Sequence, residues 1–179
     1  MLPRENLVLI GFMGSGKSAI GRVVARRLRF RFVDTDALIV KEAGQPISAI
    51  FAERGEEHFR ELETVVLQSL RNVRHSVIAT GGGVVVQERN RAILRELGFV
   101  VWLTASEEVI FERVSRNSKR PLLQTANPRA TIAEMLAVRR PLYEAAAAWS
   151  LDTTTRSHGD SAQAVIAAAR RAFAWDSAS

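Results

Sequence analysis

The sequence predicts an α/β fold in which a parallel β-sheet is covered by helices on both faces. Short apolar runs, typical of strands buried on both faces, alternate with segments of helical periodicity. A glycine-rich loop also joins the first strand directly to the first helix. The chain has 179 residues, 47% of them hydrophobic, so we expect one domain over residues 1–179 with a sizeable core.

The first half of the chain contains three predicted strands, each recognised as a short apolar run. The helices between them are recognised by apolar residues spaced three and four apart. In order, the predicted elements are a strand at residues 7–10, a helix at 17–28, a strand at 30–34, short helical stretches to about residue 51, a helix at about 57–70 and a strand at 76–80.

The second half continues the alternation after three consecutive glycines. Ser106 stands before two glutamates, which suits an N-cap and a negatively charged first turn. Residues 116–130 lack clear periodicity and contain two prolines, so we expect a loop or lid there. The remaining predicted elements are a strand at 99–103, a helix from Ser106, a helix from Thr131 that Pro141 should break or kink, a short strand near Leu151 and a helix at 160–173.

Charge and composition narrow the function classes. The net charge is +6 and 22 of the 25 basic residues are arginines, but these are scattered and form no nucleic-acid motif. The apolar runs are far shorter than the ~20 residues of a membrane span, and no secretory signal is visible. Cysteine is absent, which suits a reducing compartment. We therefore expect a cytoplasmic monomer that binds neither nucleic acid nor membrane.

The segment GFMGSGKS at residues 11–18 fits the pattern G-x-x-x-x-G-K-[ST] at every position, between a predicted strand and a predicted helix. Glycines let the backbone N–H groups of such a loop point inward, and the helix adds its positive end, so the loop favours phosphate over the alternative of a bare turn. Lys17 would reach the β and γ phosphates and Ser18 would ligate Mg²⁺. We expect a nucleoside triphosphate at Gly14, Ser15, Gly16, Lys17, Ser18 and Ala19.

Two aspartates follow the second predicted strand. Asp34 and Asp36 stand at its carboxyl end, where ligands bind in open α/β sheets. One carboxylate could support the metal and the other could accept a hydroxyl proton from the phosphoryl acceptor. A turn or helix cap is the alternative interpretation of an isolated D-x-D pattern.

Further candidate residues come later in the chain. Arg60 and Glu63 are three apart on one predicted helix, so the carboxylate could hold the guanidinium, although a surface ion pair is the alternative. The glycines at 81–83 allow close backbone approach and N–H donation to a ligand, or form a simple turn.

Arg139 is placed by helical periodicity. Ile132, Met135 and Leu136 form an apolar stripe on the helix predicted after the loop. Arg139 falls at the centre of this stripe and Arg140 lies well off it. Because an inward-facing cation needs an anionic partner, we expect Arg139 to bind an anionic substrate, with an internal ion pair as the alternative.

Together these motifs resemble the shikimate kinase family, a nucleoside-monophosphate-kinase-like class of phosphate-loop folds. The similarity covers nearly the whole chain and is strongest in GFMGSGKS, DTDALIVKEAGQPISAIFAERGEEHFRELE, ATGGG, RPLL at 120–123 and RRPLY at 139–143. The resemblance implies a three-layer α/β/α sandwich with a five-stranded parallel sheet, a substrate-binding segment at 34–62 and a lid at 116–130. It also implies Mg²⁺ and ATP-dependent phosphorylation of the 3-hydroxyl of shikimate, a step toward chorismate and the aromatic amino acids.

The resemblance assigns roles by motif position. Asp36 would bind the shikimate hydroxyls and act as the base or near it, and Asp34 with Ser18 would support Mg²⁺. Lys17 and the lid residue Arg120 would act on the phosphates, and Arg156 would lie near adenine. The implied substrate-binding residues are Asp36, Phe51, Phe59, Arg60, Gly81, Gly82, Gly83 and Arg139. No role is assigned to Lys119 or to the C-terminal tail.

Two other functions remain to be distinguished. One is a related small-molecule kinase for gluconate or a nucleoside monophosphate, although a kinase that binds a base would not need two arginines around an acceptor carboxylate. The other is a non-catalytic ligand sensor fused to a DNA-binding module. We do not expect the sensor, because the first strand begins near residue 7 and both aspartates are retained.

Overall fold

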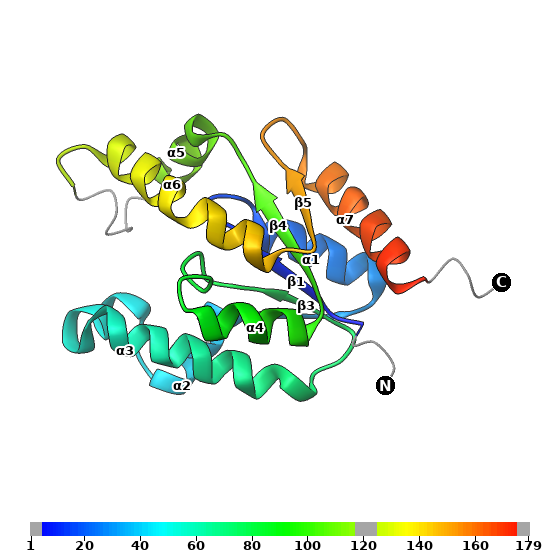
Figure 1. The fold of residues 1–179 in the computed structure, drawn as a ribbon, viewed down its shortest axis with the longest axis horizontal. Helices are drawn as coiled ribbons and strands as arrows, with labels where there is room; N and C mark the ends of the chain where they lie inside the picture. The colour runs from blue at the N-terminus through cyan, green and yellow to red at the C-terminus, as the bar shows by residue number, and fades with distance from the viewer. Residues whose placement is uncertain (1–4, 117–124, 175–179) are drawn as a thin grey trace.

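The computed structural model describes residues 5–116 and 125–174, which form a five-stranded parallel sheet with strand order β2-β3-β1-β4-β5 (Figure 1). The strands are β1 Leu7–Ile10, β2 Arg31–Asp34, β3 Ser76–Ala79, β4 Phe99–Thr104 and β5 Trp149–Asp152. The helices are α1 Lys17–Leu28, α2 Thr35–Ala43, α3 Ile47–Ser69, α4 Glu88–Leu97, α5 Glu107–Ser115, α6 Pro128–Ala146 and α7 His158–Phe173, with a short 3₁₀ helix at Leu70–Asn72.

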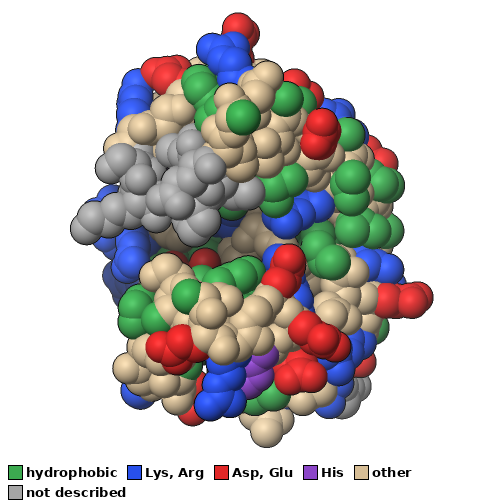
Figure 2. Space-filling view, turned by 90° about the vertical axis from the view of Figure 1, so that its left-hand side faces the viewer, with side chains coloured by type: hydrophobic (Ala, Val, Ile, Leu, Met, Phe, Trp, Pro, Cys, Tyr) green, Lys and Arg blue, Asp and Glu red, His purple; other side chains and the backbone are tan. Residues whose placement is uncertain are grey.

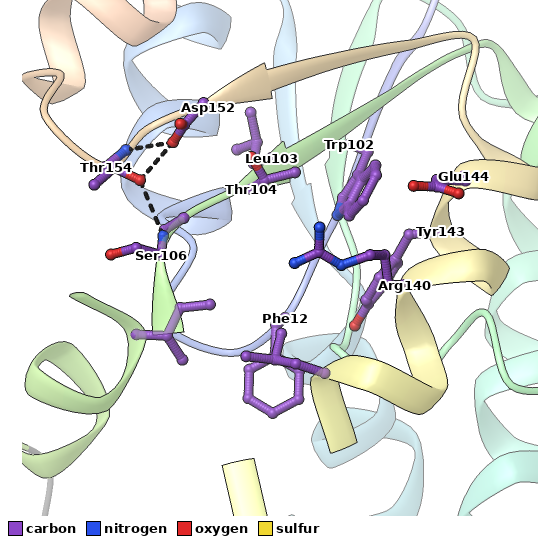
Figure 3. Close-up of a pocket in the computed structure, with 13 residues that line it drawn as sticks. Phe12, Trp102, Leu103, Thr104, Ser106, Arg140, Tyr143, Glu144, Asp152 and Thr154 are labelled. Atoms are coloured by element: carbon purple, nitrogen blue, oxygen red, sulfur yellow. Dashed lines mark hydrogen bonds between the residues drawn. The ribbon is translucent and has the colours of Figure 1, made fainter. Parts of the chain in front are cut away.

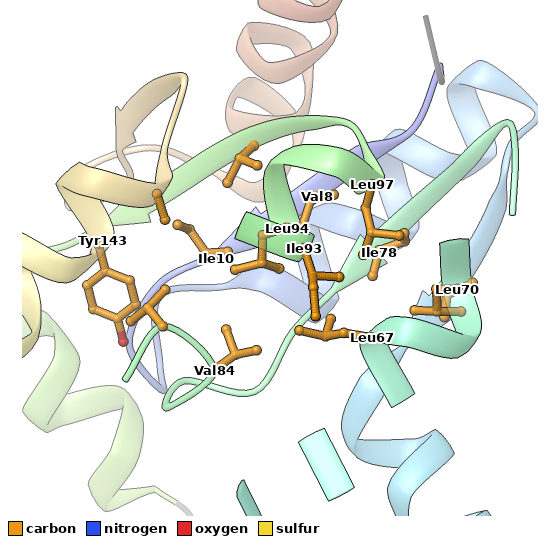
Figure 4. Packing of buried hydrophobic residues seen from close by; sticks show 14 residues of the cluster. Val8, Ile10, Leu67, Leu70, Ile78, Val84, Ile93, Leu94, Leu97 and Tyr143 are labelled. Atoms are coloured by element: carbon orange, nitrogen blue, oxygen red, sulfur yellow. The ribbon is translucent and has the colours of Figure 1, made fainter. Parts of the chain in front are cut away.

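The sheet is covered on both faces, as its continuous apolar strands predict. In β1, Val8 and Ile10 point into a core formed with α3, α4 and α6, whereas Leu7 and Leu9 point into a second core formed with α1 and α7. Figure 4 shows the first of these cores, which extends from Leu70 to Tyr143. All four residues of β1 are fully buried, which explains why the strand has no polar side chain.

Strand pairing brings the functional loops to one edge of the sheet. Leu9 of β1 pairs with Ala79 of β3, and Asp34 of β2 pairs with the same residue from the other side. The strands are parallel, so the loops that follow β1, β2 and β3 all leave at their carboxyl ends and lie next to one another. The sheet order therefore joins the phosphate loop, the two aspartates and the three glycines in space.

Several sequence-based boundaries are wrong. Helix α4 was not predicted at all. Helix α6 begins at Pro128 rather than Thr131, because Asn127 caps it and a proline fits the first turn of a helix. The helix also continues past Pro141 to its end at Ala146, so the expected break does not occur.

The predicted substrate-binding segment at 34–62 contains α2 and the first part of α3. Helix α3 spans Ile47–Ser69, but Gly55 has a non-helical backbone with φ of 78° and divides it at a kink, which agrees with the predicted short helical stretch to about residue 51 and the longer helix from about residue 57. The predicted lid at 116–130 overlaps the first turn of α6, and its residues 117–124 lie outside the described part of the chain. Within the described residues no helix is long and apolar enough to cross a membrane.

Candidate active site

The phosphate loop has the backbone conformation that its glycines allow. Gly11, Gly14 and Gly16 have φ angles of 145°, 80° and 95°, a region in which residues with a Cβ are strained. Gly16 is the N-cap of α1 and supplies no side-chain hydrogen bond to the helix, and the first turn contains no acidic residue. Among the described residues no capping side chain and no acidic residue of the first turn therefore opposes an anion at the positive end of the helix.

Lys17 lies inside the loop rather than in solvent. Its ammonium group donates hydrogen bonds to the carbonyl oxygens of Gly11 at 2.8 Å and Phe12 at 2.9 Å, and the residue is buried. These bonds hold a positive charge against the loop, where the predicted phosphates would lie.

Ser18 and Asp34 meet at the carboxyl edge of the sheet. The Ser18 hydroxyl donates to Asp34 Oδ2 at 3.2 Å. Asp34 Oδ1 accepts from the N–H groups of Asp36 and Ala37, so Asp34 is also the N-cap of α2. The helix-cap interpretation is therefore correct, and it is compatible with a metal role because the other oxygen faces Ser18. In nucleotide sites the phosphates and waters supply most Mg²⁺ ligands and the protein supplies only a few oxygen atoms. The Ser18 hydroxyl and the Asp34 carboxylate fit this requirement.

A cavity of about 510 Å³ lies beside this loop and contains all eight predicted substrate-binding residues. Its lining is Met13, Asp36, Ile47, Ser48, Phe51, Glu56, Phe59, Arg60, Glu63, Gly81, Gly82, Gly83, Met135 and Arg139. Figure 2 looks toward the side of the molecule where α2, α3, α5 and α6 lie, and it shows a hollow with acidic and basic side chains along its walls. The aromatic rings of Phe51 and Phe59 pack at 4.7 Å between centroids and supply an apolar wall.

Arg60 is held by two glutamates within this cavity. Its Nη1 donates to Glu63 Oε2 at 2.6 Å and its Nη2 to Glu56 Oε1 at 2.8 Å. The side chains of Arg60 and Glu63 are only 9% and 2% exposed, so the surface ion pair considered from the sequence is wrong. Glu63 Oε1 is buried and has no hydrogen-bond partner among the described residues.

Burial and charge set the protonation of this pair. Burial alone would lower the pKa of Arg60, but the charges and hydrogen bonds of Glu63 and Glu56 outweigh it and raise the pKa further, so the guanidinium stays charged. Burial raises the pKa of Glu63 despite the opposing charge of Arg60, and Asp36 adds to the rise. The cavity therefore contains the positively charged guanidinium of Arg60, with the acidic groups of Glu63, Glu56 and Asp36 close to one another.

The three glycines leave room for these side chains. A Cβ on Gly81 would lie 2.7 Å from Asp36 Oδ1 and 2.9 Å from Glu63 Oε1. A Cβ on Gly83 would lie 2.6 Å from the guanidinium carbon of Arg60. Gly81 is also held by its N–H, which donates to the Thr35 hydroxyl at 3.2 Å. Close side-chain packing therefore explains Gly81 and Gly83, whereas close backbone approach explains Gly82, where a Cβ would lie 3.2 Å from the backbone nitrogen of Met13.

Arg139 enters the cavity from α6, as its periodicity predicted. Its Nη1 lies 3.5 Å from the carbonyl oxygen of Gly82, and its guanidinium carbon lies 5.7 Å from the ring centroid of Phe12. In the described part of the chain it forms no ion pair with a carboxylate. The internal ion pair considered from the sequence is therefore not observed, and Arg139 faces the cavity beside Arg60.

Other predicted residues lie elsewhere. Arg120 and Lys119 fall outside the described residues. Arg156 is exposed on the loop between β5 and α7 and does not line the cavity. The sequence reasoning missed Arg113, which donates to the carbonyl oxygens of Gly14 at 3.1 Å and Thr153 at 3.2 Å and so joins α5, the phosphate loop and the loop after β5. Among 22 arginines, no local signal distinguishes it.

Comparison with known proteins decides the family. The family model described as shikimate kinase matches residues 13–170. This chain belongs to the shikimate kinase family. A shikimate kinase of Geobacter sulfurreducens is 49% identical over 87% of this chain and 86% of its own length, and one of Nitrobacter winogradskyi is 52% identical over 81% and 68%. The structure of a shikimate kinase from Acinetobacter baumannii in complex with shikimate superposes with a TM-score of 0.87, at 39% identity over 93% of this chain and 92% of that one.

The comparisons confirm several predictions from the sequence. The family, the three-layer fold with its parallel sheet, and the class of ATP-dependent phosphotransferase with an alcohol acceptor are all confirmed. The family also implies a role in aromatic amino acid biosynthesis. A gluconokinase from Sinorhizobium meliloti superposes with a TM-score of 0.62 at 19% identity, which shows a shared fold and nothing about the acceptor.

Proposed function

We propose that this member of the shikimate kinase family transfers the γ-phosphoryl group of Mg²⁺-bound ATP to the 3-hydroxyl of shikimate, giving shikimate 3-phosphate and ADP. One observation carries the proposal: a single cavity beside the phosphate loop contains the eight residues that the family pattern assigns to the substrate. The cavity and the loop are in contact, because a Cβ on Gly82 would lie 3.2 Å from the backbone nitrogen of Met13 in the loop. Both reactants would therefore bind within reach of each other.

The acceptor carboxylate has two candidate partners. Arg139 has no protein carboxylate in the described residues and faces the cavity, so its planar guanidinium can bind the shikimate carboxylate in a bidentate manner. Arg60 already neutralises Glu63 and Glu56, so we assign it a supporting contact with the same substrate.

The hydroxyl side of the substrate would face acidic groups. Asp36 lies at the amino end of α2 against Gly81, and we propose that it orients the reacting hydroxyl and accepts its proton. Glu63 Oε1, which has no hydrogen-bond partner in the described part of the chain, lies near the same glycine and offers a second acceptor for a substrate hydroxyl. An anionic polyol fits this arrangement of paired cations and acceptors better than a nucleobase does.

The phosphate side would use the loop and a metal ion. The N–H groups of the loop and Lys17 would bind the triphosphate, and Ser18 and Asp34 would hold Mg²⁺, directly or through water. Bound Mg²⁺ would neutralise charge on the phosphate oxygens. Arg120 on the predicted lid remains part of the proposal as the residue that reaches the phosphates, although it lies outside the described residues. The adenine contact of Arg156 likewise remains a prediction.

The proposal is tested by ADP release from purified protein with ATP and Mg²⁺. We expect rapid release with shikimate, and no more than background with gluconate or a nucleoside monophosphate. Omission of Mg²⁺ should abolish the signal. Faster release with gluconate than with shikimate would overturn the assigned substrate, and release that is unaffected by any acceptor would indicate a simple ATPase.

Location and assembly remain predictions. We propose that the protein acts in the cytoplasm as a monomer without a nucleic-acid or membrane partner. Analytical ultracentrifugation at assay concentrations would test the oligomeric state, and a sedimenting species near twice 19.8 kDa would contradict a monomer.

A further inference from the structure

Tyr143 links helix α6 to the glycine loop that follows β3. It lies one helical turn after Arg139, so both side chains project from the same face of α6. The Tyr143 hydroxyl donates a hydrogen bond of 2.5 Å to the carbonyl oxygen of Gly82, and Arg139 Nη1 lies 3.5 Å from the same oxygen. Two side chains of α6, Tyr143 and Arg139, thus approach the carbonyl oxygen of Gly82. Arg139 is the residue that we propose binds the substrate carboxylate.

The ring of Tyr143 is held firmly behind this contact. It stacks on Trp102 of β4 with 5.7 Å between centroids and 20° between planes, and only 1% of the residue is exposed. Figure 3 shows Trp102 and Tyr143 on one side of a second cavity, of about 340 Å³, which Arg140 of the same helix also lines. Packing on the sheet fixes the ring, so the hydroxyl cannot easily turn away from Gly82.

The protonation of Tyr143 suits a permanent donor. Burial raises the pKa of its hydroxyl to about 12, with Arg139 opposing the rise. The phenol therefore keeps its proton throughout the range in which enzymes work, and the Gly82 carbonyl can only accept.

The contact also orients the loop toward the substrate cavity. A peptide group is planar, so fixing the Gly82 carbonyl fixes the direction of the Gly83 N–H on the opposite side of the same peptide. In the part of the chain that the structure describes, the N–H groups of Gly82 and Gly83 donate no hydrogen bond to the protein. They are available to a ligand in the cavity that both glycines line.

We propose that Tyr143 is a positioning residue for the acceptor: its hydrogen bond to Gly82 sets the separation between the glycine loop and Arg139, so that loop amides and guanidinium meet the substrate carboxylate together. This inference rests on the proposed assignment of the cavity to shikimate. Tyr143 would not touch the substrate and would act through Gly82.

The variant Tyr143→Phe tests the inference because it removes only the hydroxyl and keeps the ring that stacks on Trp102. We expect the KM for shikimate to rise about threefold to tenfold, as for loss of one hydrogen bond, with kcat and the KM for ATP within about twofold of the wild type. Arg140→Ala is the matched control, since Arg140 is the exposed neighbour of Arg139 and lines the other cavity. It should change neither KM.

A second variant guards against a folding artefact. Trp102→Phe keeps the Tyr143 hydroxyl but weakens its support, and should raise the KM for shikimate in the same direction by a smaller factor. A wild-type KM for shikimate in Tyr143→Phe, with or without a lower melting temperature, would overturn the inference, as would equal rises in the KM values for both substrates. If Arg139→Ala raises the KM for shikimate while Tyr143→Phe does not, the proposed site stands and only the positioning role fails.

Discussion

The substitution Gly83→Ala should disable the acceptor site by displacing Arg60. Gly83 does not have a positive φ, so alanine can adopt its backbone conformation without strain. The new Cβ would nevertheless overlap the guanidinium of Arg60, with Nη1 nearest, Nη2 at 2.5 Å and the guanidinium carbon at 2.6 Å, whereas ordinary contact begins near 3.4 Å. The guanidinium must therefore shift by about 0.9 Å or more, and Glu63 cannot follow it freely because Glu63 is buried, whereas the exposed Glu56 can.

The size of the effect follows from the bonds that the shift breaks. The 2.6 Å bond between Arg60 and Glu63 is a hydrogen bond between charged groups, worth about 1.5 to 3 kcal/mol, and a misplacement of this size in a substrate-binding group costs up to about a hundredfold in rate. We expect kcat/KM for shikimate to fall about 10- to 100-fold while the KM for ATP changes little. Steady-state ADP release with each substrate varied in turn measures both values.

Gly159→Ala provides the matched control for this prediction. Gly159 also lacks a positive φ, and a Cβ there would meet its nearest neighbours, Arg27 Nη2 and Ser157 Oγ, at an ordinary 3.7 Å. It should leave the kinetics unchanged and not lower stability, because alanine favours the helix. Wild-type kcat/KM in Gly83→Ala would refute the placement of Arg60 against this glycine, and an equal loss in both variants would show an unspecific effect.

Three further predictions concern single side chains. Asp36→Asn should reduce kcat at least about 100-fold while ATP binding, followed by nucleotide titration, stays within about twofold, because the amide cannot accept the hydroxyl proton; unchanged turnover would refute the role. Arg139→Ala should raise the KM for shikimate about 10- to 100-fold and Arg139→Lys should recover only part of it, since an ammonium lacks the planar fork; an unchanged KM in the alanine variant would show that the arginine pairs elsewhere. The raised pKa of Tyr143, about 12 against 10.0 when exposed, means that its stabilising contribution is complete below pH 10 and is lost as pH rises to 12. The free energy of unfolding of the wild type, compared with Tyr143→Phe by denaturant titration, should thus fall by about 2 to 3 kcal/mol over that interval, and parallel curves would contradict the shift.

The nucleotide half of the site could be predicted from the sequence because it is local. The segment at residues 11–18 has glycine at each position where the loop has a positive φ, two of them required by the pattern, and the strand before it and the helix after it are contiguous in the chain. Lys17 and Ser18 follow from the same eight residues. Nothing distant in the sequence is needed to build this part of the site.

Elements without a strong local signal were harder to predict. Helix α4 has the sequence ERNRAILREL, in which Ile93, Leu94 and Leu97 form a buried apolar stripe opposite a charged face, so the helical signal is present but rests on three apolar residues. In α6, the lack of periodicity around Asn127 and Pro128 favours a loop, although both residues are typical of a helix start. Local composition gave the wrong boundary because the same residues serve loops and helix caps.

The acceptor half of the site depends on contacts between distant segments. Helical periodicity was enough to place Arg139 inward, but its neighbour Tyr143 bonds to Gly82, 61 residues earlier in the chain. Likewise Arg113 reaches Thr153 across 40 residues. Such pairs exist only once the sheet order has brought their elements together, and periodicity within a single segment cannot reveal them.

The three consecutive glycines explain why the two halves of the site occur in one fold. Each glycine accommodates a different neighbour: Gly81 the Asp36 carboxylate, Gly82 the phosphate-loop backbone at Met13, and Gly83 the guanidinium of Arg60. A side chain at any of them would push apart two groups that must act on the same phosphoryl transfer. Since such a transfer depends on positioning and charge stabilisation far more than on covalent chemistry by the protein, the space that these glycines leave matters as much as the charged side chains that occupy it.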